Sequence, residues 1–210
     1  GVDVINMANN HSQDYGKQAL LDGRANVIDA GLAPVGVGAN VEEATTPALF
    51  DINGWRVAVL GFGGVVPTTS WIATSDKPGM ANGDDGEEMA AAVRAAAGQA
   101  DLVVVVIHWG VELRTEPTQG DRELAQKMIE AGADMIFGHH SHRLQPLEKV
   151  EGVPVAWSLG NFVWPNFSVA GSTTAVARVI VSPDGTTRSC LLPAFISAPG
   201  HPELTGDADC

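Results

Sequence analysis

The sequence has 210 residues, of which 12 are Lys or Arg and 25 are Asp or Glu, so its formal net charge is −13. An apolar share of 45% with only 18% charged residues excludes a wholly disordered chain, and the length is enough for a sizeable core. The acidic balance excludes non-specific binding to nucleic acid or anionic membranes. The longest uninterrupted apolar run, residues 102–107, is far too short to span a bilayer.

Apolar spacing in the first half of the chain predicts short strands that alternate with helices. Residues 2–7 form an apolar run typical of a buried strand, and residues 15–30 have apolar side chains near helical spacing. A second short strand is expected over residues 32–37, and residues 48–61 predict a hairpin around an Asn-Gly turn. Residues 67–88 are rich in Gly, Pro, Ser, Thr and Asp, which predicts a long surface loop of the kind that often covers a site.

The second half repeats this alternation and then ends in two hairpins. The elements expected there are helices over residues 87–97 and 121–131, strands over 102–107 and 134–137, and hairpins over 145–157 and 175–192. Helices that alternate with apolar strands, followed by hairpins, indicate an α/β layered domain with mixed strand directions. We expect one domain over residues 1–192 and a C-terminal tail over residues 193–210, in which His201 is a surface residue.

The two cysteines, Cys190 and Cys210, both lie near the C-terminal end of the chain. They would pair if the tail folds back, which would suit an exported protein, or they are two unrelated thiols. Neither lies in a CxxC or Cys/His spacing typical of a metal site.

Five of the six histidines follow apolar, strand-like runs from three separate parts of the chain: His11, His108, His139, His140 and His142. In an open α/β sheet the carboxyl ends of parallel strands lie at one edge, where ligands bind, so we expect these histidines to converge there. Neutral imidazole together with oxygen donors suits divalent zinc, manganese or iron. The alternatives are hydrogen-bonded structural histidines and, for the last group, a polar loop with histidines by chance.

Three more polar residues lie at the same strand ends. Asn10 precedes the first histidine, Glu112 follows the second histidine-bearing strand, and Asn161 follows a later strand. Glu112 and Asn161 are candidate site residues, or else a solvated charge and a turn-forming amide. The tryptophans expected to pack in the core beside these strings are Trp109, Trp157 and Trp164.

Four strings around these residues resemble the bacterial capsule-synthesis family. This is the CapA, or poly-γ-glutamate biosynthesis, domain, a branch of the calcineurin-like metallophosphoesterases. The strings are Asn9-Asn10-His11-Ser12-Gln13-Asp14-Tyr15-Gly16, His108-Trp109-Gly110-Val111-Glu112, Gly138-His139-His140-Ser141-His142 and Ser158-Leu159-Gly160-Asn161-Phe162. The likeness runs from about residue 2 to residue 165. It implies a four-layer α/β sandwich with mixed sheets around a two-metal centre.

The resemblance implies a role for each histidine group. Asn10 and His108 would bind the same metal ion, and His140 and His142 would give one ligand to each of two metal ions. His11 would be the catalytic residue beside the substrate phosphate. The metals would be manganese, zinc or iron, and two cations roughly 3.5–4 Å apart would neutralise charge on the phosphoryl oxygens.

The remaining candidates, His139, Glu112 and Asn161, are expected to bind substrate. The superfamily's first motifs, which supply carboxylates including the one that bridges both metals, have no counterpart in the printed sequence. We therefore expect the domain to lack its N-terminal strands, with an apolar sheet face or edge left uncovered. We also expect weak metal retention and little hydrolysis from these 210 residues alone.

The resemblance implies a metal-dependent phosphoesterase-like domain that acts in the biosynthesis or export of capsule or poly-γ-glutamate. The expected partners are an anionic polymer or phosphoester substrate and other capsule-synthesis envelope proteins, with no nucleic acid. The expected location is the cell envelope or the exterior, with a membrane anchor in the full-length protein. The alternative is a non-catalytic assembly or polymer-binding module on the same fold, and a third option is a small-molecule binder without metal.

Overall fold

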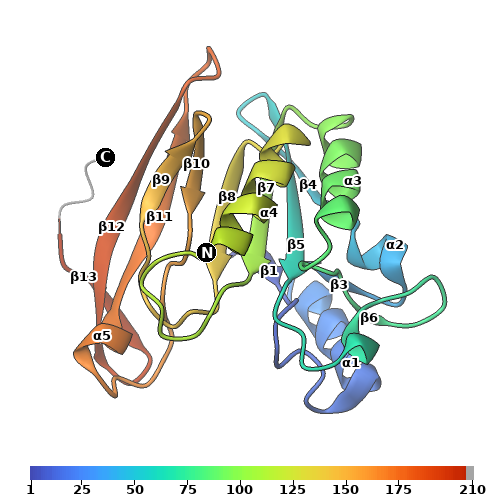
Figure 1. The fold of residues 1–210 in the computed structure, drawn as a ribbon, viewed down its shortest axis with the longest axis horizontal. Coiled ribbons are helices and arrows are strands. Elements are labelled where there is room, and N and C mark those ends of the chain that lie inside the picture. Colours follow the sequence, from blue (N-terminus) through green and yellow to red (C-terminus); the bar gives the residue numbers. More distant parts are fainter. Residues whose placement is uncertain (207–210) are drawn as a thin grey trace.

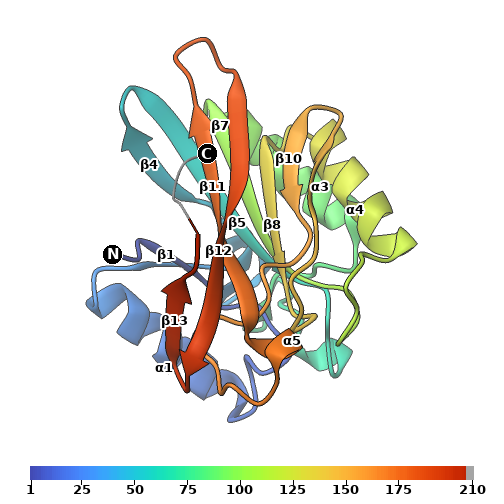
Figure 2. The same ribbon diagram turned by 90° about the vertical axis from the view of Figure 1, so that its left-hand side faces the viewer.

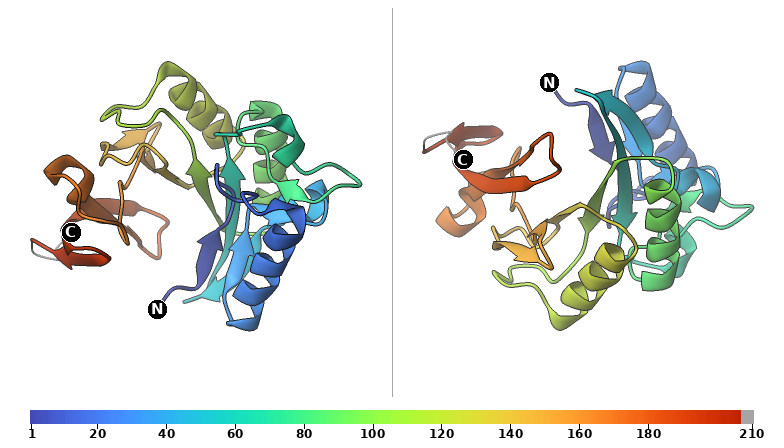
Figure 3. Two further views of the ribbon diagram at one scale, coloured as in Figure 1. Left: turned by 90° about the horizontal axis from the view of Figure 1, so that it is seen from below. Right: turned by 90° about the horizontal axis from the view of Figure 1, so that it is seen from above.

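The computed structural model describes residues 1–206 and confirms the expected mixed α/β fold (Figure 1). Helices cover one face of a six-stranded sheet, and a three-stranded sheet faces it from the other side (Figure 3). Cys210, the partner considered for Cys190, lies outside the described residues. No helix among residues 1–206 is long and apolar enough to cross a lipid bilayer.

The six-stranded sheet contains two of the strands that end at histidines. Its order is β4 (Ala48–Ile52), β5 (Trp55–Gly63), β7 (Leu102–His108), β8 (Met135–His139), β10 (Val153–Ala156) and β9 (Leu147–Val150). The inner strands β5, β7, β8 and β10 are parallel, and the edge strands β4 and β9 pair antiparallel to their neighbours. The antiparallel edges arise from hairpins that turn at Asn53-Gly54 and Glu151-Gly152, where all four residues have positive φ.

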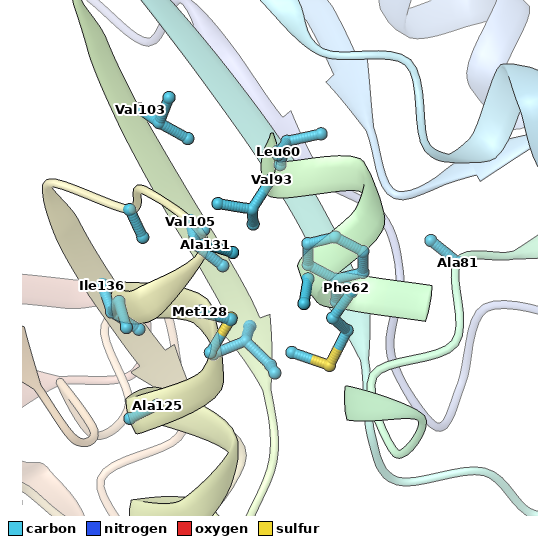
Figure 4. Packing of buried hydrophobic residues seen from close by; sticks show 14 of the residues in the cluster. Leu60, Phe62, Ala81, Val93, Val103, Val105, Ala125, Met128, Ala131 and Ile136 are labelled. Atoms are coloured by element: carbon cyan, nitrogen blue, oxygen red, sulfur yellow. The ribbon is translucent and has the colours of Figure 1, made fainter. Parts of the chain in front are cut away.

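Two helices cover one face of this sheet and bury the main core (Figure 4). They are α3 (Gly86–Ala97) and α4 (Gln119–Glu130). Val103, Val105 and Ile107 of β7 are at most 1% exposed and belong to this core. Because side chains along a strand alternate between faces, His108 points to the face opposite the helices.

Both helices begin at side-chain caps that the sequence supplies locally. The Asp85 carboxylate accepts hydrogen bonds from the backbone N–H groups of Glu87 and Glu88 at the start of α3. At the start of α4, Thr118 and Asp121 form a capping box, in which each side chain accepts from the other residue's backbone N–H. These caps explain why α3 and α4 begin within two residues of the positions predicted from the sequence.

The C-terminal part forms the three-stranded sheet of β11 (Thr173–Val181), β12 (Thr187–Ala198) and β13 (His201–Leu204). The expected domain boundary at residue 192 falls inside β12, and β13 pairs with β12 in the stretch expected to be a tail. His201 is exposed, as predicted. The helix that packs on this sheet is the four-residue α5 (Val169–Ser172), so the second helical layer of a four-layer sandwich is reduced to one turn within residues 1–206.

The N-terminal part consists of β1 (Val4–Asn6), α1 (Gly16–Asp29) and β2 (Ala33–Val35), and its strands pack against β5 of the large sheet. β1 and β2 pair in parallel as a two-stranded sheet, and β1 is half-buried, where the sequence predicted a buried strand. Asn6 joins this unit to the large sheet, because its Nδ2 group donates to the carbonyl oxygens of Phe62 in β5 and Val106 in β7. Its Oδ1 atom accepts from the backbone N–H of Ala8.

The prediction of a surface loop over residues 67–88 is wrong for much of that segment. The segment contains the short elements η1 (Thr69–Trp71) and β6 (Gly79–Met80), and β6 pairs with β3 (Val37–Gly38), beside the one-turn helix α2 (Val41–Ala44). Met80 and Ala81 are fully buried, and Ala73 is 4% exposed. These apolar residues are buried by partners distant in the sequence, which local composition does not reveal.

An apolar cleft of about 550 Å³ lies between the face of the large sheet that the helices leave free and the hairpin of β11 and β12. It is lined mainly by Val57, Leu102, Val104 and Met135 of the large sheet and by Val179 and Val181 of the hairpin. Figure 2 shows the hairpin of β11 and β12 in front of the large sheet.

Candidate metal centre

The histidines gather at the edge of the large sheet where its parallel strands end. β5 points toward the lower end of the sheet in Figure 1, and β7 and β8 run parallel to it. His108 and His139 are the last residues of β7 and β8 and lie in register, with ring centroids 4.8 Å apart. The ring of His140 lies 4.5 Å from that of His108. The structure therefore brings together histidines from two of the three predicted strand ends.

The third strand end delivers Asn10 and His11 through a tight turn after β1. The Asn9 side chain accepts from the backbone N–H of His11 at 2.8 Å, and the Ser12 hydroxyl donates to the carbonyl of Asn9 at 2.7 Å. This turn places Asn10 Oδ1 2.9 Å from His108 Nε2, although the two residues are 98 positions apart. The expected meeting of Asn10 with His108 is thus present in the fold.

His11 lies on the outer side of this turn with a carboxylate partner. Its Nδ1 atom is 2.8 Å from Asp14 Oδ2, and its side chain is 73% exposed. Sequence reasoning missed Asp14 as the partner of His11, although its position three residues later in a turn is a usable local signal. The contact holds the ring through Nδ1 and leaves Nε2 out of this interaction.

The turn after β8 holds two histidines in uncommon backbone conformations. His140 has φ of 110° and His142 has φ of 54°, a region that non-glycine residues seldom adopt. The turn is held by Ser141, whose hydroxyl donates to the carbonyl of Arg143 and whose backbone carbonyl accepts from Leu113. Backbone strain retained at clustered histidines is typical of functional sites.

His142 is fixed by side chains that follow β10. Its Nδ1 atom lies 2.6 Å from Asn161 Oδ1, and its ring lies 4.8 Å from the ring of Trp164. Trp164 is 41% exposed, so the expectation that it packs in the core is wrong, whereas Trp109 and Trp157 are buried as predicted. The sequence placed Asn161 near the site but gave no indication of which histidine it contacts.

The other two substrate-binding candidates take different positions. His139 is partly buried against His108. Glu112 is exposed in the turn after β7, and its negative charge acts on His140. The substrate contacts expected for both residues remain proposals.

Burial keeps these imidazoles neutral. It is the main cause that lowers the pKa of His108 to about 2, with further contributions from the neighbouring histidines. Burial lowers the pKa of His139 to about 4, and it also lowers the pKa of His140, against which the Glu112 carboxylate acts in the raising direction. Neutral imidazole is the form that binds a metal ion.

The donor atoms at the sheet edge fit one divalent cation in part. Asn10 Oδ1 and His108 Nε2 lie side by side, and the Nδ1 atoms of His108 and His140 are both buried with no hydrogen-bond partner within residues 1–206. A buried, unpartnered ring nitrogen is costly unless a ligand occupies it. Within residues 1–206, however, no group of three or more His, Cys, Asp or Glu side chains is arranged to hold a metal ion. The centre therefore relies on the amide oxygen of Asn10, and the set Asn10, His108, His140 and His142 is only partly assembled.

Sequence comparison decides the family. The profile described as "Bacterial capsule synthesis protein PGA_cap" matches residues 1–166, which include every candidate site residue. This chain belongs to the PGA_cap family. The match confirms the resemblance based on the four strings.

Curated relatives of this PGA_cap chain are named for capsule polymer synthesis. The PGA biosynthesis protein CapA of Bacillus subtilis strain 168 is 35% identical over 194 residues, which cover 92% of this chain and 50% of that protein. The capsule biosynthesis protein CapA of Bacillus anthracis is 33% identical over 212 residues, which cover 100% of this chain and 51% of that protein. The chain thus spans about half the length of these two relatives.

Solved structures with a fold similar to that of this PGA_cap chain include a phosphatase and a thiohydrolase. A phosphatase of Mycoplasma pneumoniae superposes with a TM-score of 0.60 and 14% identity, over 92% of this chain and 73% of that one. The sulfate thiohydrolase SoxB of Thermus thermophilus superposes with a TM-score of 0.57 and 17% identity, over 92% of this chain and 33% of that one. At these identities the likeness establishes the fold alone.

Proposed function

We propose that this chain is the metal-binding part of a phosphoesterase-like domain that acts in the synthesis of a capsule polymer such as poly-γ-glutamate. The observation that carries the proposal is the convergence of Asn10 Oδ1, His108 Nε2 and the unpartnered His140 Nδ1 at the carboxyl edge of the sheet. Their types, one amide oxygen and two neutral imidazoles, suit manganese, zinc or iron.

The residues have distinct roles in this proposal. Asn10, His108 and His140 hold one cation, and His142 is the ligand that this chain offers to a second. A bound divalent cation supplies Lewis-acid polarisation of a phosphoryl oxygen. Asp14 fixes the ring of His11 through Nδ1, and Nε2 is the nitrogen that would give a proton to the leaving oxygen.

The names of the relatives support a substrate class and a cellular place for this proposal. Two curated relatives are named for capsule or PGA biosynthesis, which supports an anionic polymer or a phosphoester precursor as the substrate and a cell-envelope location. With a net charge of −13, the chain has little to attract such an anion unless cations are bound at the site. Other envelope proteins of capsule synthesis are the expected partners.

A second candidate is a non-catalytic assembly or polymer-binding module. The incomplete ligand set within residues 1–206 favours it, because a phosphoesterase of this type needs carboxylate ligands for its second cation. In this case the site retains one cation, which attracts an anionic polymer without turnover.

Metal content and turnover separate these functions. The full-length protein is incubated with manganese, zinc or iron, dialysed and analysed for metal, and then assayed with a generic phosphodiester. The proposal requires bound metal that decreases in His140→Ala and is retained in His201→Ala, which changes an exposed histidine in β13. Equal metal content in His140→Ala would contradict it. Turnover lost in His11→Ala at unchanged metal content identifies a phosphoesterase, whereas metal binding without turnover identifies the binding module.

A further inference from the structure

Asn161 is a buried amide whose two ends contact different groups. It is 7% exposed, its Oδ1 atom lies 2.6 Å from His142 Nδ1, and its Nδ2 atom donates to the carbonyl oxygen of Gly171 at 2.9 Å. A backbone carbonyl can only accept a hydrogen bond, so the amide NH2 group must face Gly171. The amide orientation is therefore fixed, and its oxygen must face His142.

This orientation determines which nitrogen of His142 carries the proton. An amide oxygen only accepts, so the neutral His142 ring must have its proton on Nδ1 and a free lone pair on Nε2. In water a neutral histidine favours the opposite tautomer, with the proton on Nε2. The fold therefore selects the less common form at this position.

Neighbouring contacts keep the pair in place. The ring of Trp164 lies against His142, with centroids 4.8 Å apart, and the backbone of the segment that carries Asn161 is held by Thr174, whose hydroxyl donates to the carbonyl of Leu159 at 2.7 Å. Thr174 is 1% exposed, and its hydroxyl group bonds to Leu159 rather than to His142. Because Asn161 is fixed by packing and hydrogen bonds, it can hold the ring of His142 in one orientation.

We propose that Asn161 is a positioning residue that locks His142 in the Nδ1–H tautomer, so that Nε2 is the nitrogen available to a cation, and that Asn161 does not itself bind substrate. This replaces the substrate contact expected from the sequence. That His142 Nε2 binds a cation rests on the proposed metal function, whereas the tautomer of His142 does not.

The test measures the tautomer directly, by long-range proton–nitrogen NMR of the imidazole rings in the metal-free chain at a pH where His142 is neutral. The His142 signals are assigned by their loss in His142→Gln. We expect the parent chain to show the proton on Nδ1, Asn161→Leu to move it to Nε2 or to a mixture, and Asn161→Asp to keep it on Nδ1 because the carboxylate still accepts. Thr174→Val, which removes a buried hydrogen bond from the same segment, is the matched control and keeps the parent tautomer.

Metal affinity is the second readout. Titration with manganese or zinc should show an affinity about 10–100-fold lower in Asn161→Leu, while Asn161→Asp and Thr174→Val stay near the parent. A proton on Nε2 in the parent chain, or an unchanged tautomer in folded Asn161→Leu, overturns the proposal. If the parent chain binds no metal but shows the Nδ1–H tautomer that Asn161→Leu removes, the positioning role stands and the proposed metal function fails.

Discussion

The indole N–H of Trp109 donates a 2.9 Å hydrogen bond to the backbone carbonyl of Trp157, and the two rings stack with centroids 5.6 Å apart. This contact joins the ends of β7 and β10 across β8, which lies between them in the sheet. Gly138 of β8 fits beneath it because it has no side chain: a Cβ atom there would collide with both the Trp157 oxygen and the Trp109 nitrogen. The histidines that follow Gly138 thus depend on a strand held close to this pair.

Replacing Gly138 by Ala should therefore destabilise the domain by about 3 kcal/mol or more, the upper part of the range for overpacking. The new methyl group would collide with the backbone carbonyl of Trp157, which has little freedom to move, so the strain has no easy release. Urea unfolding of the purified chain measures the change. Gly120→Ala is the matched control, because its nearest neighbour, Thr118 Oγ1, would lie at an ordinary 3.7 Å. Equal midpoints for the two variants would show that β8 tolerates the methyl group.

Asn6→Ala should reduce the free energy of unfolding by about 2–3 kcal/mol. The substitution removes three hydrogen bonds and leaves the carbonyls of Phe62 and Val106 without the donor that joins them to β1. Denaturant unfolding is again the measurement, and Asn166→Ala is the control. Asn166 is exposed and its side chain donates a hydrogen bond of 3.2 Å to the carbonyl of Ser197, so the substitution should change stability by less than about 0.5 kcal/mol. Similar losses of unfolding free energy in both variants would show that Asn6 does not link β1 to the large sheet.

Stability of the metal-free chain should fall as the pH is lowered from 7 to 5. The pKa of His108 is lowered to about 2 and that of His139 to about 4, so the folded state leaves both rings neutral in this range. The unfolded chain takes up protons on both rings below about pH 6.5, and each ring then adds a slope of about 1.4 kcal/mol per pH unit. The loss continues until the pH approaches the folded-state pKa values.

Urea unfolding at pH 7, 6 and 5 in the presence of a chelator measures this slope. His108→Gln and His139→Gln should each flatten it, because each removes one ring that protonates on unfolding. Asn166→Ala, which removes no titrating group, should keep the parent slope. A slope that is the same in parent and histidine variants would mean that carboxylates alone cause the pH dependence.

Val104 and Val105 are neighbours in β7 that face opposite sides, and they should respond differently to a larger side chain. Val104 lines the apolar cleft of about 550 Å³, whereas Val105 is fully buried against the helices. Val104→Phe has room and should change the free energy of unfolding by less than about 1 kcal/mol, while Val105→Phe should cost roughly 3 kcal/mol or prevent folding. Thermal unfolding of the pair checks this, and a large loss in Val104→Phe would mean that the cleft is not available to side chains.

Much of this fold could be predicted from the sequence because its helices and strands have strong local signals. The helix predicted over residues 87–97 is α3, Gly86–Ala97, and its start is marked by the Asp85 cap. The hairpins formed where Asn-Gly and Glu-Gly pairs fix positive φ. The segment over residues 67–88 was mispredicted because Ala81 is held by a backbone hydrogen bond to Gly36, a partner that local composition does not identify.

The candidate site could likewise be predicted where local patterns determine it, but not where it depends on partners distant in the sequence. That His108 and His139 end neighbouring strands could be predicted, because each follows an apolar run and parallel strands share an edge. The partners of the side chains could not: Asn161 meets His142 across 19 positions, and Trp164 covers that ring instead of packing in the core. These contacts depend on how the loop after β10 returns to the sheet, which no short-range pattern encodes.

The separate pairing of β1 with β2 has a consequence for when the site exists. Asn10 and His11 belong to the small N-terminal unit, whereas His108 and His140 belong to the large sheet, and Asn6 is one side chain that joins the two. The two parts are also closely packed, since a Cβ atom on Gly61 of β5 would lie 2.5 Å from Asn6 Oδ1 and 2.8 Å from a methyl group of Val35 in β2. The histidine edge therefore holds its amide oxygen only through this packing, and any local opening at this boundary would remove Asn10 from the site without unfolding the large sheet.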